Sequence, residues 1–162
     1  MVFEKTWVSP VGNLRIQGSD SGLRAIIFPE HRVGKIKTEV DVSLDSKHPF
    51  LLRVEQELQE YFFEKRREFT LNLDFSGATE FQKKVWQSLL KIPYGQTVSY
   101  SEQTSKLLGW KETARRAVAQ ANSRNPFSIV VPCHRVIAAN GALHGYGGGL
   151  HIKKALLELE RS

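Results

Sequence analysis

The spacing of apolar residues changes near residue 75, and this change most constrains what the 162-residue chain can fold into. Before it, apolar residues alternate in short segments at 2–7, 14–17 and 23–28, separated by Gly, Pro, Ser and Asp. Such alternation places every second side chain on one face of a strand. After residue 78, apolar residues recur every three or four positions, as in helices. We therefore expect an α+β protein with a small antiparallel sheet in its first half and mainly helices in its second.

One helix and one further strand complete the predicted N-terminal half. The apolar residues between positions 49 and 62 fall on one face of a helix, with acidic and basic residues on the other. The alternation of Phe69, Leu71 and Leu73 predicts another strand. The polar segment 30–47 has weak periodicity and is interpreted as a loop or a poor edge strand.

The net charge divides at the same place as the apolar pattern. Residues 1–77 carry 11 basic and 12 acidic side chains, whereas residues 78–162 carry 12 basic and 5 acidic ones. We interpret Asp74–Ala78 as the linker between an N-terminal domain, residues 1–75, and a C-terminal domain, residues 79–162. The basic surplus of the second half favours contact with a polyanion such as nucleic acid, and a solvated basic face is the alternative.

Four helices are predicted in the second half. Thr79 with Gln82, and Ser99 with Glu102, each have the spacing of a capping box at a helix N-terminus. Two of the helices flank a short turn that contains Gly109, which is typical of a helix-turn-helix motif. A plain helical hairpin is the alternative. The expected helices span residues 79–90, 99–108, 112–122 and 150–160.

Composition excludes several classes of protein. Apolar residues make up 41% of the chain and charged residues 25%, as in ordinary globular proteins. No apolar run approaches the roughly 18 residues that cross a bilayer. The first residues also lack the basic and then apolar layout of a signal peptide. A cytoplasmic protein with no membrane partner is therefore expected.

Cys133 is the only cysteine, which excludes internal disulfides and multi-cysteine metal sites. We expect neither a metal nor a cofactor. Cys133 follows Pro132 and the apolar run 127–131, which we interpret as a buried strand. A lone cysteine is most often a small buried apolar residue. However, an imidazole or a cation can activate a thiol as a nucleophile, and His134 and Arg135 follow directly.

An activated Cys133 places two demands on its surroundings. Neighbouring side chains of a strand point to opposite faces, so a turn or a bridging water is predicted between Cys133 and His134. The imidazole also needs a carboxylate to orient it. The spacing does not choose among the acidic residues of the second half, which are Glu80, Glu102, Glu112, Glu158 and Glu160.

The third predicted helix of the second half carries a stripe of small residues, Ala114, Ala117 and Ala121. A small-residue face lets a helix approach a partner closely. The partner could be another helix of the core or the floor of a DNA groove, and the stripe alone favours neither.

Several segments of the second half together resemble a known family. They are FQKKVWQSLLKIPYGQTVSY at 81–100, ARRAVAQANSRNP at 114–126, PCHRV at 132–136, NG at 140–141, GYGGGL at 145–150 and KKALLELE at 153–160. These motifs resemble those of the O6-alkylguanine-DNA alkyltransferases, also called methylated-DNA–protein-cysteine methyltransferases. Residues 1–75 are similar only in their strand-then-helix layout. The resemblance implies a ribonuclease-H-like N-terminal domain and a C-terminal domain with a winged-helix-like helix-turn-helix.

The resemblance implies direct repair of DNA. Family members move the alkyl group of O6-alkylguanine to a cysteine in one irreversible turnover, and we expect O4-alkylthymine to be a substrate as well. The target nucleotide must first be flipped out of the duplex. By resemblance, Cys133 is the acceptor, and His134 takes its proton through a water, with Glu160 behind the imidazole. The implied partner is double-stranded DNA, bound through its minor groove by a monomeric protein.

The resemblance also assigns roles to the surrounding residues. It implies that Tyr100 helps to extrude the nucleotide and protonates guanine N3, that Arg116 fills the vacated space, and that Asn125 is a hinge. Some members have a serine where this chain has Gly147, so a hydroxyl contact to O6 is not expected. The implied DNA-contacting residues are Tyr100, Ala114, Arg115, Arg116, Ala117, Ala121 and Arg124. The implied alkyl and base pocket comprises Pro132, Val136, Tyr146, Gly147 and Gly148.

Two other classes of function remain as alternatives. A non-catalytic helix-turn-helix regulator or lesion-sensing protein would bind DNA without transferring anything, although lesion-sensing relatives replace the acceptor cysteine and Cys133 is intact. A cysteine hydrolase would turn over many times. Moles of product per mole of protein distinguish the hydrolase from an alkyl acceptor.

Overall fold

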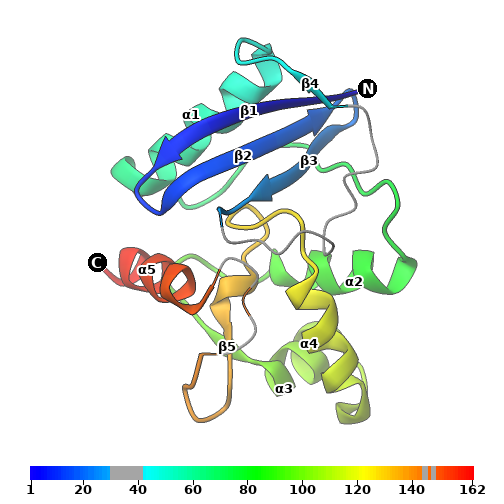
Figure 1. Cartoon of the computed structure of the whole chain (residues 1–162). Coiled ribbons are helices and arrows are strands. Elements are labelled where there is room, and N and C mark those ends of the chain that lie inside the picture. The colour runs from blue at the N-terminus through cyan, green and yellow to red at the C-terminus, as the bar shows by residue number, and fades with distance from the viewer. Residues whose placement is uncertain (30–41, 144–145, 147–148) are drawn as a thin grey trace.

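The computed structural model describes residues 1–29, 42–143, 146 and 149–162. A sheet with helix α1 forms one layer of the molecule, and the remaining helices gather below it (Figure 1). This is the expected α+β arrangement. Within the described residues, no helix has the length and apolar character needed to span a bilayer.

The N-terminal sheet has four strands in the order β3-β2-β1-β4. The predicted antiparallel meander is confirmed by β1 (Val2–Ser9), β2 (Gly12–Ser19) and β3 (Gly22–Ile27). The short strand β4 (Val42–Leu44) pairs in parallel with β1, so the end of the polar segment forms an edge strand. Residues 30–41 of that segment lie outside the described residues.

Helix α1 (Pro49–Glu64) packs against this sheet through its apolar face. Its proline occupies the first turn, where the missing N–H is not needed, and His48 caps the helix by accepting a hydrogen bond from the backbone N–H of Phe50. The side chain of Tyr61 is 1% exposed. It lies on the buried face, near the C-terminal end of the helix.

The prediction of a strand over residues 69–73 is wrong. Only Leu73 forms a bridge, with Leu23, and the backbone N–H of Leu23 donates to the carbonyl oxygen of Asn72 at 2.8 Å. The backbone N–H of Thr70 instead donates to the carboxylate of Glu57 at 2.8 Å. Because Glu57 accepts the hydrogen bond from Thr70, this backbone N–H is not available to a neighbouring strand, and no β-ladder extends along residues 69–73.

The helix-turn-helix motif follows α2 (Glu80–Leu89). Its first helix comprises α3 (Tyr100–Glu102) and a π-helical continuation, η1 (Gln103–Leu107). Its second comprises a 3₁₀ turn, η2 (Glu112–Ala114), and α4 (Arg115–Ser123). Both predicted capping boxes form, at the starts of α2 and α3.

The interpretation of residues 127–131 as a strand is also wrong, although the run is buried. Phe127 makes one bridge, to Ile26 of β3, and the chain then turns so that the N–H of Val131 donates to the carbonyl of Phe127 at 2.8 Å. Ile129 has φ +74°, an unusual conformation for a β-branched residue. Tight burial of the segment accounts for its four apolar residues without a ladder.

A two-stranded parallel sheet joins the motif to the cysteine. Strand β5 (Val98–Ser99) runs directly into α3 and pairs with β6 (Val136–Ile137). A 3₁₀ turn, η3 (Cys133–Arg135), leads directly into β6, which confirms the predicted turn between Cys133 and His134. The pairing therefore holds the start of α3 beside the cysteine. The last helix, α5 (Leu150–Arg161), packs against η3.

The two halves of the chain share one hydrophobic core. A single cluster of buried residues includes Leu14 and Leu58 of the first half together with Val85 and Leu156 of the second. The backbone N–H of Ile26 also donates to a carbonyl beyond α4, that of Pro126, at 2.9 Å. The sheet layer is therefore packed directly onto the segment that leads to Cys133.

Candidate active site

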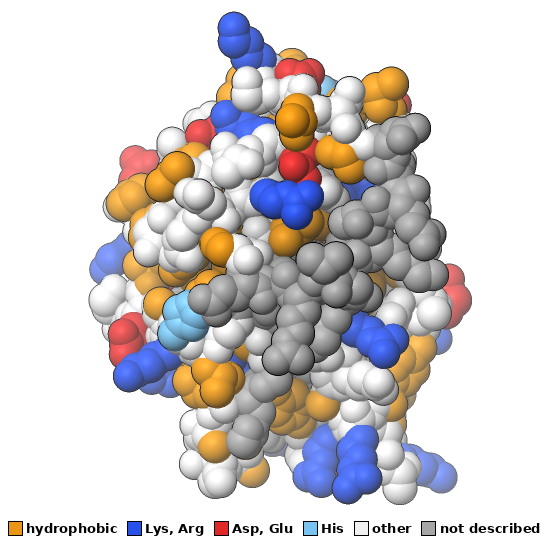
Figure 2. All heavy atoms as spheres, in the orientation of Figure 1, with side chains coloured by type: hydrophobic (Ala, Val, Ile, Leu, Met, Phe, Trp, Pro, Cys, Tyr) orange, Lys and Arg blue, Asp and Glu red, His pale blue; other side chains and the backbone are white. Residues whose placement is uncertain are grey.

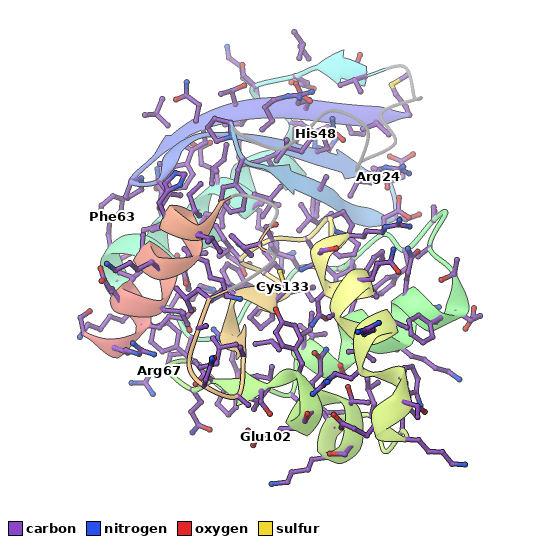
Figure 3. The ribbon with its side chains drawn as sticks, turned by 60° about the horizontal axis from the view of Figure 1, so that its bottom comes forward. Arg24, His48, Phe63, Arg67, Glu102 and Cys133 are labelled. Carbon is purple, nitrogen blue, oxygen red and sulfur yellow. The ribbon has the colours of Figure 1, made fainter. Side chains whose placement is uncertain are left out.

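Two consecutive tight turns present Cys133. The N–H of Cys133 donates to the carbonyl of Val131 across Pro132 at 2.9 Å, and the N–H of Arg135 donates to the carbonyl of Pro132 at 3.0 Å. Cys133 is 7% exposed. Figure 3 shows it near the centre of the second half, whereas Glu102 and Arg67 lie at the periphery. A substrate atom must therefore enter a pocket to reach the sulfur of Cys133.

The surroundings of the thiol act on its charge in opposite directions. Burial raises the pKa of Cys133, while a hydrogen bond from Asn125 and the nearby charge of Lys153 act to lower it. Burial prevails, so the thiol is protonated at rest. Lys153 is 1% exposed, and its ammonium donates to the carbonyl of Val136 at 2.7 Å. A base is thus needed to ionise Cys133, with Lys153 placed to stabilise the thiolate.

His134 follows Cys133 directly and is the residue from which that base is expected. Its side chain is fully buried, and its Nε2 lies 2.7 Å from Oε2 of Glu160. Burial lowers the pKa of His134 despite the opposing effect of Glu160, so the imidazole is neutral. An ionised carboxylate only accepts, which places the single ring proton on Nε2. Nδ1 is then an acceptor, and it is buried without a hydrogen-bond partner among the described residues.

Glu160 is the carboxylate that the spacing alone could not choose. Burial alone would raise the pKa of Glu160, but hydrogen bonds from His134, Arg135 and Tyr61 outweigh it and hold this pKa well below its usual range. Arg135 donates through Nε at 2.8 Å and through Nη2 at 3.1 Å, and Tyr61 donates at 2.6 Å. The backbone N–H of Gly95 also donates, at 3.3 Å. The other four acidic candidates are all exposed: Glu80, Glu102, Glu112 and Glu158.

The cation beside the thiol is not the one that the sequence suggested. The guanidinium of Arg135 binds Glu160 and the carbonyl of Ile92, the latter at 2.7 Å, and so it is already neutralised. Lys153 acts on Cys133 instead. The sequence did carry a signal for it, because Lys153 and Glu160 both fall within the apolar stripe of α5. Charged residues in such a stripe indicate a buried, satisfied pair or a functional site.

Asn125 ties the end of α4 to the cysteine turn. Its Nδ2 donates to the carbonyl of Val131 at 2.8 Å, and its Oδ1 accepts from the backbone N–H of Phe127 at 2.9 Å. Together with its hydrogen bond to Cys133, these contacts use both ends of the amide. The position between α4 and the cysteine turn suits the expected hinge.

Two tyrosines lie close enough to Cys133 for a negative charge on its sulfur to raise their pKa values. Tyr100, the first residue of α3, is partly buried, and burial followed by the charge of Cys133 raises its pKa. The same two causes raise the pKa of Tyr146 well above its usual value. Both phenols are therefore proton donors at neutral pH. Pro132 and Val136 are buried on either side of the cysteine turn. The other two expected pocket residues, Gly147 and Gly148, lie outside the described residues.

The outer face of the helix-turn-helix is basic. Arg115, Arg116 and Arg124 are exposed, as is the methyl group of Ala117. Figure 2 shows Lys and Arg side chains gathered at the lower end of the molecule, over α3 and α4. The basic surplus that the charge distribution revealed is therefore exposed on this face.

The small-residue stripe of α4 is divided between this face and the core. Ala114 is partly exposed and Ala117 is exposed, but Ala121 is 4% exposed and lies in the hydrophobic core. The carbonyl of Ala121 accepts a hydrogen bond from Nε1 of Trp86 at 2.8 Å. Ala121 therefore cannot contact DNA in this arrangement, and the expectation that it does so is corrected.

The fold and the site define a class of protein. A neutral histidine and an ionised glutamate form a buried hydrogen-bonded pair, the histidine directly follows a buried cysteine, and β5 and β6 join this turn to a basic helix-turn-helix. This combination places a nucleophile beside a surface suited to nucleic acid.

Comparisons with known proteins agree with this class. Residues 2–75 match the family model "6-O-methylguanine DNA methyltransferase, ribonuclease-like domain", and residues 80–162 match "6-O-methylguanine DNA methyltransferase, DNA binding domain". The chain belongs to this family. It is 45% identical over 154 residues to the methylated-DNA–protein-cysteine methyltransferase of Methanosarcina acetivorans, covering 95% of each chain.

Solved structures show the same fold. Mycobacterium tuberculosis OGT, crystallised in complex with DNA, superposes with a TM-score of 0.86 at 40% identity, over 98% of this chain and 92% of that one. The O6-methylguanine-DNA methyltransferase of Pyrococcus kodakaraensis gives a TM-score of 0.67 at 26% identity, over the whole of both chains.

Proposed function

We propose that this protein repairs DNA by moving the alkyl group of O6-alkylguanine to the sulfur of Cys133, once per molecule. The observation that carries the proposal is Nδ1 of His134, which has no hydrogen-bond partner among the described residues. His134 directly follows Cys133, is buried and neutral, and has its Nε2 fixed by Glu160. Such a base can take a thiol proton without competition from another donor. Family membership and the adjoining basic helix-turn-helix supply the substrate class.

The first step moves a proton. The Cys133 proton passes to Nδ1 of His134, with a bridging water between them. Glu160, kept ionised, stabilises the resulting imidazolium through Nε2. Lys153 stabilises the thiolate.

The second step moves the alkyl group. The thiolate sulfur attacks the alkyl carbon, a C–S bond forms, and the bond between that carbon and O6 breaks with its electron pair leaving on the guanine. Tyr100, whose phenol is protonated at neutral pH, gives its proton to N3 of guanine as this bond breaks and is left as a phenolate. The proton held by His134 then returns to the phenolate through solvent, and exchange with water moves the guanine proton from N3 to N1. The products are an unmodified guanine and a neutral thioether. A thioether has no acidic proton and is a poor leaving group, so the step ends the protein's activity.

Binding must bring the base to the sulfur. Because Cys133 is 7% exposed, a stacked base cannot reach it, which supports nucleotide flipping. We propose that α4 enters the minor groove, where Ala114 and Ala117 permit close approach and Arg116 fills the gap in the stack. Arg115 and Arg124 would contact phosphates.

The proposal extends to several finer points. The single-turnover chemistry needs only one Cys133, so one copy of the chain suffices and a monomer is proposed. O4-alkylthymine presents a comparable alkyl–oxygen bond and is proposed as a second substrate. The two family models match residues 2–75 and 80–162, which supports domain limits at 1–75 and 79–162 within one shared core.

Removal of Arg124 should weaken DNA binding in a salt-dependent way. Arg124→Ala is expected to reduce the slope of log affinity against log salt concentration by about one, because one phosphate contact is lost. Binding to duplexes of different sequence should weaken equally. Fluorescence anisotropy across a salt series measures the slope. The exposed Arg53→Ala on α1 is the control, and an unchanged slope for Arg124→Ala would remove this residue from the interface.

Alkylation should destabilise the protein. An alkyl group added to the buried sulfur overpacks the site, at a cost of about 1–3 kcal/mol. The alkylated protein should therefore melt several degrees below the free protein in calorimetry. Equal melting temperatures would show that the site has room for the group.

Product counting tests the proposed function. A duplex with one O6-methylguanine, supplied in tenfold excess, should yield one restored guanine per protein molecule and then no more. Continued turnover would indicate a hydrolase, and binding without product would indicate a lesion sensor.

A further inference from the structure

The first half of the chain brings a hydroxyl group, that of Tyr61, to the candidate active site. Tyr61 lies on the buried face of α1, 99 residues before Glu160 in the sequence, and its hydroxyl donates to Oε2 of Glu160 at 2.6 Å. Neither the tyrosine nor the carboxylate is more than 5% exposed. The hydrogen bond therefore lies in the core that the two halves share, out of contact with solvent.

Tyr61 and His134 bind the same carboxylate oxygen. Nε2 of His134 lies 2.7 Å from Oε2 of Glu160, and the Tyr61 hydroxyl lies 2.6 Å from that atom. Each donor withdraws negative charge from the oxygen, so a strong bond from Tyr61 weakens the attraction of the carboxylate for a protonated imidazole. The phenol thus acts on His134 through Glu160.

We propose that Tyr61 is a positioning residue of the alkyl-transfer site, which orients Glu160 and sets how readily His134 gives up and takes a proton. This inference rests on the proposed function. It assigns to the N-terminal half a chemical contribution in addition to its packing. Through Tyr61, the half of the chain farther from the helix-turn-helix acts on the base that ionises Cys133.

Other groups around the pair are fixed and do not replace Tyr61. Arg135 holds Oε1 and Oε2 from η3, and the backbone N–H of Gly95 binds Oε1. Lys153 of α5 also acts on His134 through its charge. The charge of Glu160 acts in turn on Tyr94, in the loop after α2, and on Tyr146, whose pKa values it raises. The hydroxyls of Tyr94 and Tyr146 have no hydrogen-bond partner among the described residues.

The test is the pH dependence of methyl transfer in Tyr61→Phe. Without the hydroxyl, Glu160 attracts a protonated imidazole more strongly, so the pKa of His134 rises. Because transfer needs the neutral imidazole, the acidic limb of the rate profile should move to higher pH, by about one unit. Single-turnover rates with an O6-methylguanine duplex between pH 5 and 9 measure it. A merely structural role would lower the rate at every pH and leave the midpoint unchanged.

Tyr94→Phe is the matched control. Its ring lies 6.1 Å from that of Tyr61, and its buried hydroxyl has no hydrogen-bond partner among the described residues. Loss of this hydroxyl should leave the midpoint where it is in the unchanged protein. An equal shift in both variants would overturn the proposal, as would no shift in Tyr61→Phe.

A second substitution keeps the test decisive if Tyr61→Phe fails to fold. 3-Fluorotyrosine at position 61 retains the ring and makes the hydroxyl a stronger hydrogen-bond donor. The pKa of His134 should then fall, and the acidic limb of the rate profile should move to lower pH. An unmoved limb would again overturn the proposal. Titration of ¹⁵N-labelled His134 by NMR compares the midpoints of the variants directly, without any methyl transfer. If the unchanged protein transferred no methyl group at any pH, the proposed function would fail, and the NMR midpoints alone would decide the role of Tyr61.

Discussion

Cys133→Ser is expected to abolish methyl transfer, by at least about a thousandfold, while leaving DNA binding intact. A serine hydroxyl is far harder to ionise than a thiol, and neutral His134 is too weak a base to form an alkoxide. The substitution changes one atom in a buried position and touches none of the exposed arginines of α4. Single-turnover methyl transfer and anisotropy titration with the same duplex measure the two properties.

The pattern of the two measurements distinguishes the candidate functions. Lost transfer with unchanged affinity identifies Cys133 as the acceptor. Methyl transfer that persisted in Cys133→Ser would place the acceptor elsewhere in the chain and contradict the mechanism.

Glu160→Gln is expected to slow methyl transfer by about a hundredfold or more. The neutral amide cannot stabilise an imidazolium, and its NH₂ group can present a donor to Nε2, which favours the wrong tautomer of His134. The substitution also leaves Arg135 buried without its counter-ion. Loss of one partner from a buried pair predicts a fall of about 3 kcal/mol in the free energy of unfolding.

The stability loss in Glu160→Gln should depend on pH. The pKa of Glu160 is lower in the folded protein than in the unfolded chain, so its contribution is complete above the ordinary glutamate value of about 4.3. The contribution disappears as the pH falls toward the folded-state pKa. Urea unfolding should therefore show a large difference between the two proteins at pH 7 and a smaller one below pH 4.

Glu158→Gln is the control for this experiment. Glu158 lies on the exposed face of the same helix. Its substitution should change neither the rate nor the stability beyond about 0.5 kcal/mol. Equal effects at positions 158 and 160 would show that the buried hydrogen-bonded group is not what matters.

Local signals in the sequence predict most of the fold. Thr79 and Ser99 mark the starts of α2 and α3 because a capping box satisfies donors within four residues of itself. The antiparallel meander of β1 to β3 is predictable for the same reason, since its turns are short and its alternation is regular.

The two wrong strands depend on contacts that are distant in sequence. Thr70 bonds to Glu57 of α1, and Phe127 bonds to β3 across about 100 residues. Periodicity reports burial, and a buried turn such as 127–131 is as apolar as a buried strand.

The site shows the same division between local and distant information. Cys133 and His134 are adjacent, so their residue types alone indicate a nucleophile and its base. The choice of Glu160 among five carboxylates depends on the family resemblance. Lys153 and Tyr61 were missed because each acts from a helix that periodicity describes only as amphipathic. Their buried polar contacts exist only once α1 and α5 pack against the cysteine turn.

Intact-protein mass spectrometry after incubation with an O6-methylguanine duplex tests the central claim most directly. We expect a gain of one methyl group per molecule, mapped by peptide digestion to Cys133, with none after incubation with unmodified duplex. A methyl group on another residue, or no gain in mass from a duplex that the protein binds, would contradict it.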